Sequence, residues 1–451
     1  MDESQRVSVP AVDDQAESRT EPIVLVEQAP DPDVRRRWRP PSFELNAVAL
    51  MAATGITGVV GLAFWAVAAR LPPAEVGRAS AILTTATMLS QLSSSNVGVL
   101  FGRVLAAAGA KSRSLVLGGY GIAVALSLVL GAAFVLVIPN ELLTGTVEKV
   151  AFPLIVALFS LFALQDWVLT GIRKSVWIPL EQLLFAIGKL GLLLLFSVWA
   201  LQNGIVLSWV LPCLLAVLVV NAVLLGRTLP RRRAAEAGAT EMPDRRGLAR
   251  IFLAEYATGA VMYVVPLTLP LLVVAVLGTE ANAYYAVPWL ISESLGLLIF
   301  NISSSYLVEA AHDSRRIAAL MARTIRLIAL VAVPGVAVVM IAAPWILSIL
   351  GPAYAAEGST VLRLMVLAIP FSTVSTLYVA ICRIQLQMAR VVVIEAMIAV
   401  LVIGFAFALV GPLGLAGVGL GYLIAEVVVA AATIVPLVRF LRANQFSLRR
   451  R

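Results

Sequence analysis

The chain has 451 residues, of which 60% are hydrophobic and 13% charged, with a net charge of +8 and a mean hydropathy of +0.95. Soluble domains carry about 25% charged residues, so this composition excludes a water-soluble globular fold. The apolar runs continue without polar alternation over the roughly 20 residues that a membrane helix needs, which excludes an outer-membrane barrel. The two cysteines lie within apolar runs and His312 is the single histidine, so no disulfide framework or metal site is expected.

The first 44 residues differ in composition from the rest of the chain. They contain ten acidic and six basic residues, several prolines and no apolar period, a composition typical of a disordered segment. The cluster Arg35-Arg36-Arg37-Trp38-Arg39 precedes the first apolar run. Basic residues beside a membrane helix favour the cytoplasmic side, so the N-terminus is predicted to be cytoplasmic.

Apolar runs from residue 46 onward predict twelve membrane helices, which makes the fold class an all-α polytopic membrane protein. They are expected at 46–69, 78–104, 115–138, 150–171, 177–200, 204–226, 250–277, 283–308, 324–350, 360–382, 389–410 and 415–438. Turn residues separate several of the runs, as at Pro72-Pro73, Gly351-Pro352 and Gly411-Pro412. Six tryptophans near the predicted helix ends fit an aromatic belt at the membrane surface: Trp65, Trp177, Trp199, Trp209, Trp289 and Trp345.

The positive charges support this topology. With the N-terminus inside, 29 of the 34 Lys and Arg fall in segments on the cytoplasmic side, and three fall outside, namely Arg70, Arg78 and Lys149. This asymmetry is what the positive-inside rule requires. Both termini of this multi-pass protein are therefore predicted to be cytoplasmic.

An Arg-rich segment divides the membrane region into two equal sets of helices. The predicted organisation is a tail (1–44), a six-helix lobe (45–226), a cytoplasmic linker (227–249), a second six-helix lobe (250–438) and a basic cytoplasmic C-terminal tail (439–451). At an offset of 205 residues Glu75 matches Glu280, Asn96 matches Asn301, and Phe101 matches Tyr306. Six helices per lobe imply a parallel repeat, with the pseudo-twofold axis along the membrane normal.

Two such lobes are a common plan of alternating-access transporters. The chain lacks a phosphate-binding loop of the G-x-x-x-x-G-K-[ST] type and any pattern of catalytic residues. We therefore expect a transporter and not an enzyme, with a channel as a weaker alternative because no repeated filter segment is visible.

Ionisable residues within the apolar runs are the candidate functional residues, because each costs about 2.5–3.5 kcal/mol to insert. Lys189, near the predicted midplane, suits an anionic group such as a diphosphate; its alternative is a structural pair with Glu181, Asp166 or another buried carboxylate. Glu293 and Glu426 could bind a coupling proton or sodium ion, or could form interhelical hydrogen bonds as protonated carboxyls.

Other polar residues accompany these three. Asp166 is a further candidate for ion coupling, although snorkelling and capping near the cytoplasmic helix end suffice to explain it, as they do for Glu255 and Glu395. Arg363 could guide a phosphate or serve as an interfacial anchor. The substrate path is completed by Gln91, Asn96 and Asn301. No cofactor is expected beyond a coupling ion.

Three stretches together resemble the polysaccharide-exporter (Wzx-like flippase) branch of the multidrug/oligosaccharidyl-lipid/polysaccharide exporter (MOP) superfamily. The first is Phe64-Trp65-Ala66-Val67-Ala68-Ala69-Arg70-Leu71 with Glu75-Val76-Gly77. The second is Asp166-Trp167-Val168-Leu169-Thr170-Gly171-Ile172-Arg173 with Lys189-Leu190. The third is Ile349-Leu350-Gly351-Pro352-Ala353-Tyr354 with Leu362-Arg363-Leu364.

The resemblance implies a V-shaped fold with a central hydrophilic cavity that includes Lys189. It also implies a bacterial inner-membrane flippase that moves a polyprenyl-diphosphate-linked glycan from the inner to the outer leaflet, in contact with membrane lipids and with envelope polysaccharide synthesis enzymes as partners; no nucleic acid is expected. One alternative is an ion-coupled antiporter of cationic drugs from the same superfamily, which Glu293 and Glu426 would suit. The other is a non-transporting membrane scaffold for envelope synthesis.

Overall fold

The computed structural model describes residues 60–105, 108–137, 142–172, 174, 177–199, 203–230, 261–312, 317–385 and 387–449. All of them belong to one unit, Ala52–Arg451. The predicted tail 1–44 and residues 231–249 of the predicted linker lie outside the described residues.

The described residues form helices at all twelve predicted places and no strand, which confirms the predicted fold class. Residues 60–68 are helical and correspond to the first predicted helix. The others are α2 (Pro73–Val104), α3 (Ser112–Val137), α4 (Thr146–Gly171), α5 (Trp177–Val198), α6 (Gly204–Val223), α9 (Val264–Leu277), α10 (Thr279–His312), α11 (Ile317–Ser348), α12 (Pro352–Ile384), α13 (Met388–Leu413) and α14 (Leu415–Arg449). A π-helical turn, Leu224–Thr228, continues α6.

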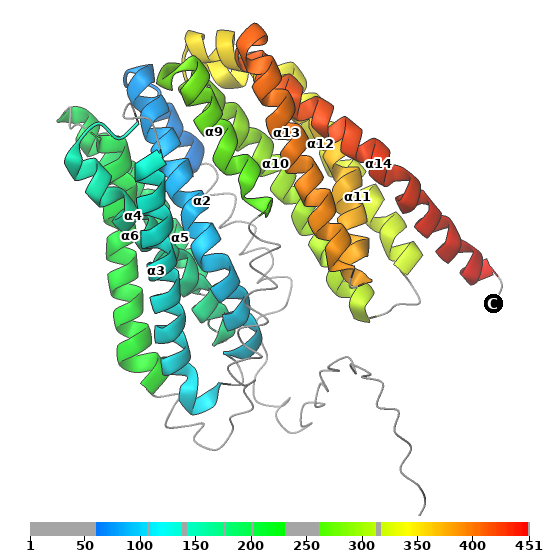
Figure 1. Cartoon of the computed structure of the whole chain (residues 1–451), viewed down its shortest axis with the longest axis horizontal. Helices are drawn as coiled ribbons and strands as arrows, with labels where there is room; N and C mark the ends of the chain where they lie inside the picture. Colours follow the sequence, from blue (N-terminus) through cyan, green and yellow to red (C-terminus); the bar gives the residue numbers. More distant parts are fainter. Residues whose placement is uncertain are drawn as a thin grey trace, which may run out of the picture. The chain divides into compact units, whose positions relative to one another are not determined.

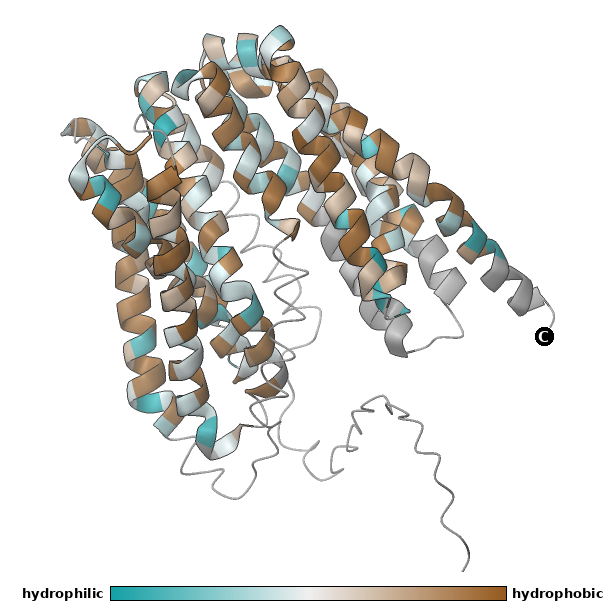
Figure 2. Ribbon diagram, viewed as in Figure 1, coloured by the Kyte–Doolittle hydropathy of each residue, from teal (hydrophilic) through white to brown (hydrophobic). Residues whose placement is uncertain are grey.

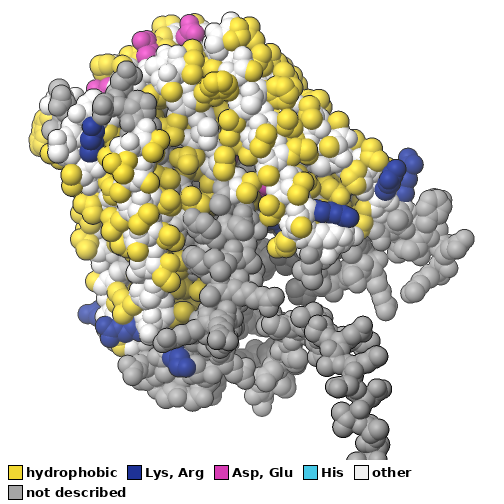
Figure 3. All heavy atoms as spheres, viewed as in Figure 1, with side chains coloured by type: hydrophobic (Ala, Val, Ile, Leu, Met, Phe, Trp, Pro, Cys, Tyr) yellow, Lys and Arg dark blue, Asp and Glu magenta, His cyan; other side chains and the backbone are white. Residues whose placement is uncertain are grey.

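Eight of the described helices are long and apolar enough to cross a membrane, namely α3 to α6 and α11 to α14. Hydrophobic residues predominate along these helices (Figure 2). On the face drawn in Figure 3, hydrophobic side chains cover most of the surface and charged side chains gather at the helix ends. Apolar surface of this extent marks a membrane-facing protein.

Helix α2 is as long as these eight but more polar, because it faces the protein interior. Several of its hydroxyl side chains are buried, and Ser93 and Ser94 each donate to a backbone carbonyl one turn earlier, at 2.8 and 2.7 Å. Such bonds satisfy a hydroxyl within its own helix. A polar helix can thus lie at membrane depth without contacting lipid.

Proline and glycine set the helix ends, as the sequence indicates, with one correction. Helices α2 and α12 begin at Pro73 and Pro352, where the missing N–H of proline costs no intrahelical bond. The predicted turn at Gly411-Pro412 is wrong, since α13 continues to Leu413 and the chain turns at Gly414, whose φ is +58°. Combined with a ψ of −140°, this φ suits glycine, which lacks a Cβ. Helix α14 continues to Arg449, beyond the expected end at residue 438.

The helices pack in two groups, which we call the first half (60–230) and the second half (261–449). In the first half α4 contacts α2, α3, α5 and α6, and in the second half α12 contacts α10, α11, α13 and α14. Helix α2 joins the halves by packing against α9 and α10. Figure 1 shows the two sets of helices with α2, α9 and α10 between them.

The helix starts reveal how closely the halves correspond. The starts of α2 and α10 are 206 residues apart, those of α3 and α11 are 205 apart, and those of α4 and α12 are 206 apart. The starts of α5 and α13, and of α6 and α14, are both 211 apart. The predicted offset of 205 thus describes the first three of these pairs to within one residue, and it is longer for the rest because α12 has 33 residues where α4 has 26.

Candidate functional site

Lys189 lies on α5 among three aromatic rings. Its Nζ is 4.2 Å from the ring centroid of Trp209 on α6, and 5.4 Å from those of Phe64 and Phe185. Trp209 in turn packs edge-on against both phenylalanines, at centroid distances of 6.0 and 5.9 Å. Cation–π contacts of this kind favour an ammonium group at about 0.5–2 kcal/mol each, most when it is desolvated. We call these three rings the Lys189 cage.

No carboxylate neutralises Lys189 within the described part of the chain. The ion pair given by the structure joins Arg78 to Glu148 instead. The sequence left open a pair between Lys189 and Glu181 or Asp166, and the described side chains do not form it. The positive charge of Lys189 is therefore held by ring faces, which leave its hydrogen-bonding capacity for another partner.

A cavity of about 320 Å³ in the first half adjoins the Lys189 cage. Phe185 and Trp209 belong to both the cage and the cavity wall. The wall also includes Gln91 and Asp166, two residues singled out from the sequence. The lining residues are Thr87, Ser90, Gln91, Phe159, Phe162, Ala163, Asp166, Trp167, Gln182, Phe185, Trp209 and Cys213. This mixture of aromatic faces and a few polar groups is typical of sites that bind organic molecules.

A second cavity, of about 240 Å³, lies in the second half. It is lined by Met262, Gly296, Ile299, Ser372, Ser375, Thr376, Val379, Ala380, Arg383, Glu395, Ile398, Tyr422 and Glu426. Glu426 is only 3% exposed, and its Oε2 has no hydrogen-bond partner among the described residues. Glu426 also lies within electrostatic range of Glu395 and Glu293. The second cavity is therefore acidic at its buried side, with Arg383 as its positive residue.

The remaining predicted site residues lie outside the two cavity walls. Arg363 on α12 is exposed and donates from Nε to the backbone carbonyl of Met340 on α11, at 3.0 Å. The Glu293 side chain is exposed on α10, and Asn96 is buried in α2. Asn301 lies in α10, but its side chain is outside the described part. The structure thus brings Lys189, Gln91 and Asp166 into one region and places Glu426 in another.

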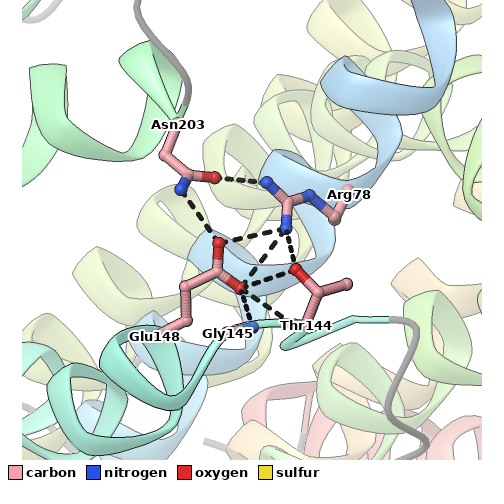
Figure 4. A network of polar contacts seen from close by, with 5 residues as sticks. All are labelled: Arg78, Thr144, Gly145, Glu148 and Asn203. Atoms are coloured by element: carbon pink, nitrogen blue, oxygen red, sulfur yellow. Dashed lines mark hydrogen bonds and ion pairs between the residues drawn. The ribbon is translucent and has the colours of Figure 1, made fainter.

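A polar network ties together the first turns of α2, α4 and α6 (Figure 4). Arg78 donates to Glu148 Oε1 at 3.2 Å and also to Asn203 Oδ1, while Asn203 Nδ2 donates to Glu148 Oε1 at 2.9 Å. Glu148 Oε2 accepts from the backbone N–H of Thr144 at 2.9 Å. We call Arg78, Glu148 and Asn203 the polar clamp. It fixes the ends of these three helices and so holds together helices that line the first cavity.

Several residues of both cavities escaped the sequence analysis. Trp209 fitted an interfacial belt by its position, yet it lies against Lys189. Phe64 and Phe185 carry no signal that separates them from ordinary core residues. Arg383 was counted as a loop charge, but it lines the second cavity. One signal in the sequence could have identified Phe185. It is four residues from Lys189, and this spacing places the two side chains on one face of α5.

The described helices form two packed groups joined by α2, α9 and α10, and this architecture is similar to that of several solved membrane proteins. A solved structure of a multidrug resistance MATE family transporter of the MOP superfamily, in an inward-facing conformation, aligns with a TM-score of 0.68 at 15% identity, covering 86% of this chain and 95% of that one. The lipid II flippase MurJ, in an inward closed conformation, aligns with a TM-score of 0.62 at 13% identity, covering 86% and 87%. A MOP superfamily transporter from Pyrococcus furiosus, described as having a binding pocket of reverse polarity, gives 0.57 at 18% identity, covering 88% and 95%.

These similarities establish the fold, which is that of MOP superfamily transporters. No protein-family model matches the sequence, and no curated protein matches it significantly. Drug exporters and a lipid flippase share this fold, so the choice between their functions rests on the side chains of the site.

Proposed function

We propose that this protein is a flippase of the MOP type that moves a polyprenyl-diphosphate-linked glycan across the bacterial inner membrane, with both termini in the cytoplasm. The observation that carries the proposal is the Lys189 cage beside the first cavity. Lys189 presents a positive charge that no described carboxylate neutralises. It lies against Phe185 and Trp209 of a cavity whose wall also contains Phe159, Phe162 and Trp167. A diphosphate requires such a cation, and aromatic faces suit the apolar faces of sugars and the first isoprene units.

Three further roles complete the proposal. Gln91 lines the cavity and would hydrogen-bond to the glycan, with Asn96 and Asn301 on the paired helices α2 and α10 nearby in the path. Arg363 would guide the diphosphate near the membrane surface. Coupling to a proton or sodium gradient would use carboxylates on the membrane helices, among them Glu426, Glu293 and Asp166. Enzymes of envelope polysaccharide synthesis would supply and consume the lipid.

The second candidate is an ion-coupled antiporter of cationic drugs. The acidic second cavity favours it, because Glu395 and Glu426 would attract an organic cation. The share of each chain covered is similar for the drug exporter and the lipid flippase, so the fold supports both candidates equally. The third candidate, a scaffold acting through the 1–44 tail, involves residues outside the described part.

Depletion of the protein in its native bacterium tests the choice. We expect one polyprenyl-diphosphate glycan to accumulate in extracted lipids, as measured by mass spectrometry, and Lys189→Gln not to restore the normal pool. Lys111→Gln, which removes an exposed lysine outside both cavities, is the matched control and should restore it. Unchanged lipid pools, together with raised sensitivity to cationic dyes, would instead establish the drug antiporter.

A sidedness assay must accompany the depletion, because a block in a later step would also cause lipids to accumulate. The proposed flippase function predicts that the accumulated glycan remains on the cytoplasmic side, where an impermeant enzyme or lectin added to intact cells cannot reach it. A glycan that is accessible from outside would contradict the proposal.

A further inference from the structure

The second cavity is lined by side chains of both charges, and the proposed flippase function gives its positive residue, Arg383, no role. Arg383 lies in the last turn of α12. Glu395 lies about two turns into α13, and Glu426 lies on α14. All three line the same cavity of about 240 Å³. A single small molecule in this cavity can therefore contact a cationic and an anionic side chain at once.

The positive and negative charges occupy different ends of the cavity. Arg383 and Glu395 are half-buried, whereas Glu426 is 3% exposed. Glu395 lies within electrostatic range of Arg383, while the charged groups in range of Glu426 are two acids, Glu395 and Glu293. The buried end of the cavity is therefore negative, and the more open end is positive.

The buried end offers hydrogen-bond acceptors that have no donor. Glu426 Oε2 and Ser375 Oγ lack a hydrogen-bond partner among the described residues, and Ser375 is 2% exposed. Buried polar atoms without a partner are rare in proteins, so a donor from a ligand would complete this end. A primary ammonium carries three N–H donors. A quaternary ammonium would instead need several aromatic faces, and Tyr422 is the one aromatic residue of the described wall.

The open end offers donors that have no strong acceptor. Arg383 Nη2 lies 3.9 Å from Met262 Sδ, and a thioether is a weak acceptor. No described acid forms an ion pair with Arg383, although Glu395 is in electrostatic range. A guanidinium group presents a fork of N–H donors that matches a carboxylate or a phosphate. An organic cation would complete the buried end but would leave this guanidinium without an anion.

The wall between the two ends limits the size and the polarity of a ligand. Ile299, Val379, Ala380 and Ile398 make this part of the wall apolar. Drug-sized ligands occupy cavities of about 300–1,000 Å³, and this cavity is smaller. A fitting ligand is therefore small, with a short apolar segment between two groups of opposite charge.

We propose that the second cavity binds a small zwitterion, with its primary ammonium at Glu426 and Ser375 and its acid group at Arg383. Two sources supply this chemistry, namely a free amino acid and the headgroup of a phospholipid that carries an ammonium beside its phosphate. The proposal goes beyond the flippase function and does not rest on it, because that function was argued from the first cavity.

Three probes of matched length test the two charges separately. They are 4-aminobutyrate, which carries both charged groups, butylamine, which carries the ammonium alone, and butyrate, which carries the carboxylate alone. Binding is measured by calorimetry on the purified full-length protein in detergent. We expect 4-aminobutyrate to bind at least about tenfold more tightly than either of the other two, equivalent to 1.4 kcal/mol.

Two variants assign the charges to their side chains. In Arg383→Gln, 4-aminobutyrate should bind no better than butylamine, and in Glu426→Gln it should bind no better than butyrate. The matched controls are Arg390→Gln and Glu357→Gln, which remove exposed charges outside the cavity wall and should keep the full selectivity. Arg383→Gln decides the matter if Glu426→Gln, a change at a buried site, does not purify as a monodisperse protein.

Competition between lipids and 4-aminobutyrate identifies the source of the zwitterion. Phosphatidylethanolamine in mixed micelles presents an ammonium and a phosphate, whereas phosphatidylglycerol presents the phosphate without an ammonium. Displacement of 4-aminobutyrate by phosphatidylethanolamine alone would identify a lipid headgroup as the ligand. Displacement by neither lipid would identify a free zwitterion.

Either of two results would overturn the proposal. Butylamine that binds as tightly as 4-aminobutyrate, with no effect of Arg383→Gln, would show a site for simple organic cations. Failure of all three probes to bind would show that the cavity recognises no charged ligand of this size. The flippase proposal is tested by lipid accumulation and by Lys189→Gln, so its failure is distinguishable from either result.

Discussion

The side-chain amide of Asn282 on α10 donates hydrogen bonds to the backbone carbonyl of Gly77 on α2, at 2.9 Å, and to Ser80 Oγ, at 3.0 Å. Gly77 and Asn282 are 205 residues apart, so they occupy corresponding positions in the two halves to within one residue. A residue that touches the helix turn of its own counterpart lies close to the axis relating the halves. This contact therefore marks where the pseudo-twofold axis passes between α2 and α10.

The first prediction concerns the space at Gly77. A Cβ atom there would lie 1.6 Å from the backbone oxygen of Thr279, so Gly77→Ala must push α2 and α10 apart. We expect a loss of about 1–3 kcal/mol in stability, the usual cost of overpacking, seen as a lower unfolding midpoint in detergent. The matched control is Gly118→Ala on α3, where a Cβ meets nothing within 4 Å. Equal midpoints for the two variants would show that the α2–α10 contact is not tight.

The second prediction measures the ion pair of the polar clamp. Arg78 and Glu148 are about one-fifth exposed, at 20% and 21%, and share several hydrogen bonds. A double-mutant cycle with Arg78→Gln and Glu148→Gln should give a coupling energy of about 1 kcal/mol, the upper range for partly exposed pairs. The coupling should change little with added salt, since partly buried pairs are weakly screened. A coupling near zero would mean that the pair orients the helices without stabilising them.

The third prediction separates two contributions of Asn203 to stability, that of its backbone conformation and that of its side-chain amide. Its φ of +61° lies in the left-handed region, and its side-chain amide hydrogen-bonds to Arg78 and Glu148 in the polar clamp. Asn203→Gly and Asn203→Ala both remove the amide, but only alanine is strained at this φ, by about 1–2 kcal/mol. Unfolding in graded denaturant should therefore rank Asn203→Gly above Asn203→Ala by about that amount. The reverse ranking would show that the turn relaxes to another conformation.

The fourth prediction addresses the Lys189 cage. Trp209 makes the shortest ring contact with Lys189, at 4.2 Å. Trp209→Leu removes a cation–π contact of about 0.5–2 kcal/mol while retaining an apolar side chain. For the lipid-linked substrate of the proposed function, we expect binding to weaken roughly two- to thirtyfold, as measured by competition with a fluorescent analogue, whereas Trp209→Phe keeps most of the affinity. Equal affinities for the two variants would assign Trp209 a packing role only.

The fold could be predicted from the sequence because its signals are patterns along the chain. These are the hydrophobic runs and the uneven distribution of positive charges between the loops. The sequence was also sufficient for the repeat, since the offset of 205 between Glu75 and Glu280 is within one residue of the offset between the starts of α2 and α10. The turn at Gly411-Pro412 was misplaced because Pro412 lies within the last turn of α13, and membrane helices tolerate a proline when other groups satisfy the freed backbone carbonyl. Local signals of this kind locate a helix end only to within a few residues.

The site was less predictable, for a physical reason. Lys189 stands out in an apolar run, but its neighbours are set by the packing of α5 against α6 and against residues 60–68. Nothing in the sequence around Phe64 or Trp209 indicates a cationic neighbour. Glu181 was considered as a partner for Lys189, yet its closest described partner is the Gln165 amide on α4. Contacts between helices distant in sequence decide these roles.

Among the described residues, the polar clamp exists in one half only. At the offsets that align the helix starts, Arg78 corresponds to Tyr284, Glu148 to Tyr354, and Asn203 to Gly414. There, Tyr354 packs edge-on against Tyr284, with ring centroids 5.0 Å apart, and Gly414 combines a positive φ with a ψ of −140°, unlike the left-handed Asn203. The two halves therefore differ mechanically at these helix ends: directional hydrogen bonds and an ion pair hold those of the first, so its bundle resists shear there, whereas a ring contact without such directional bonds holds those of the second.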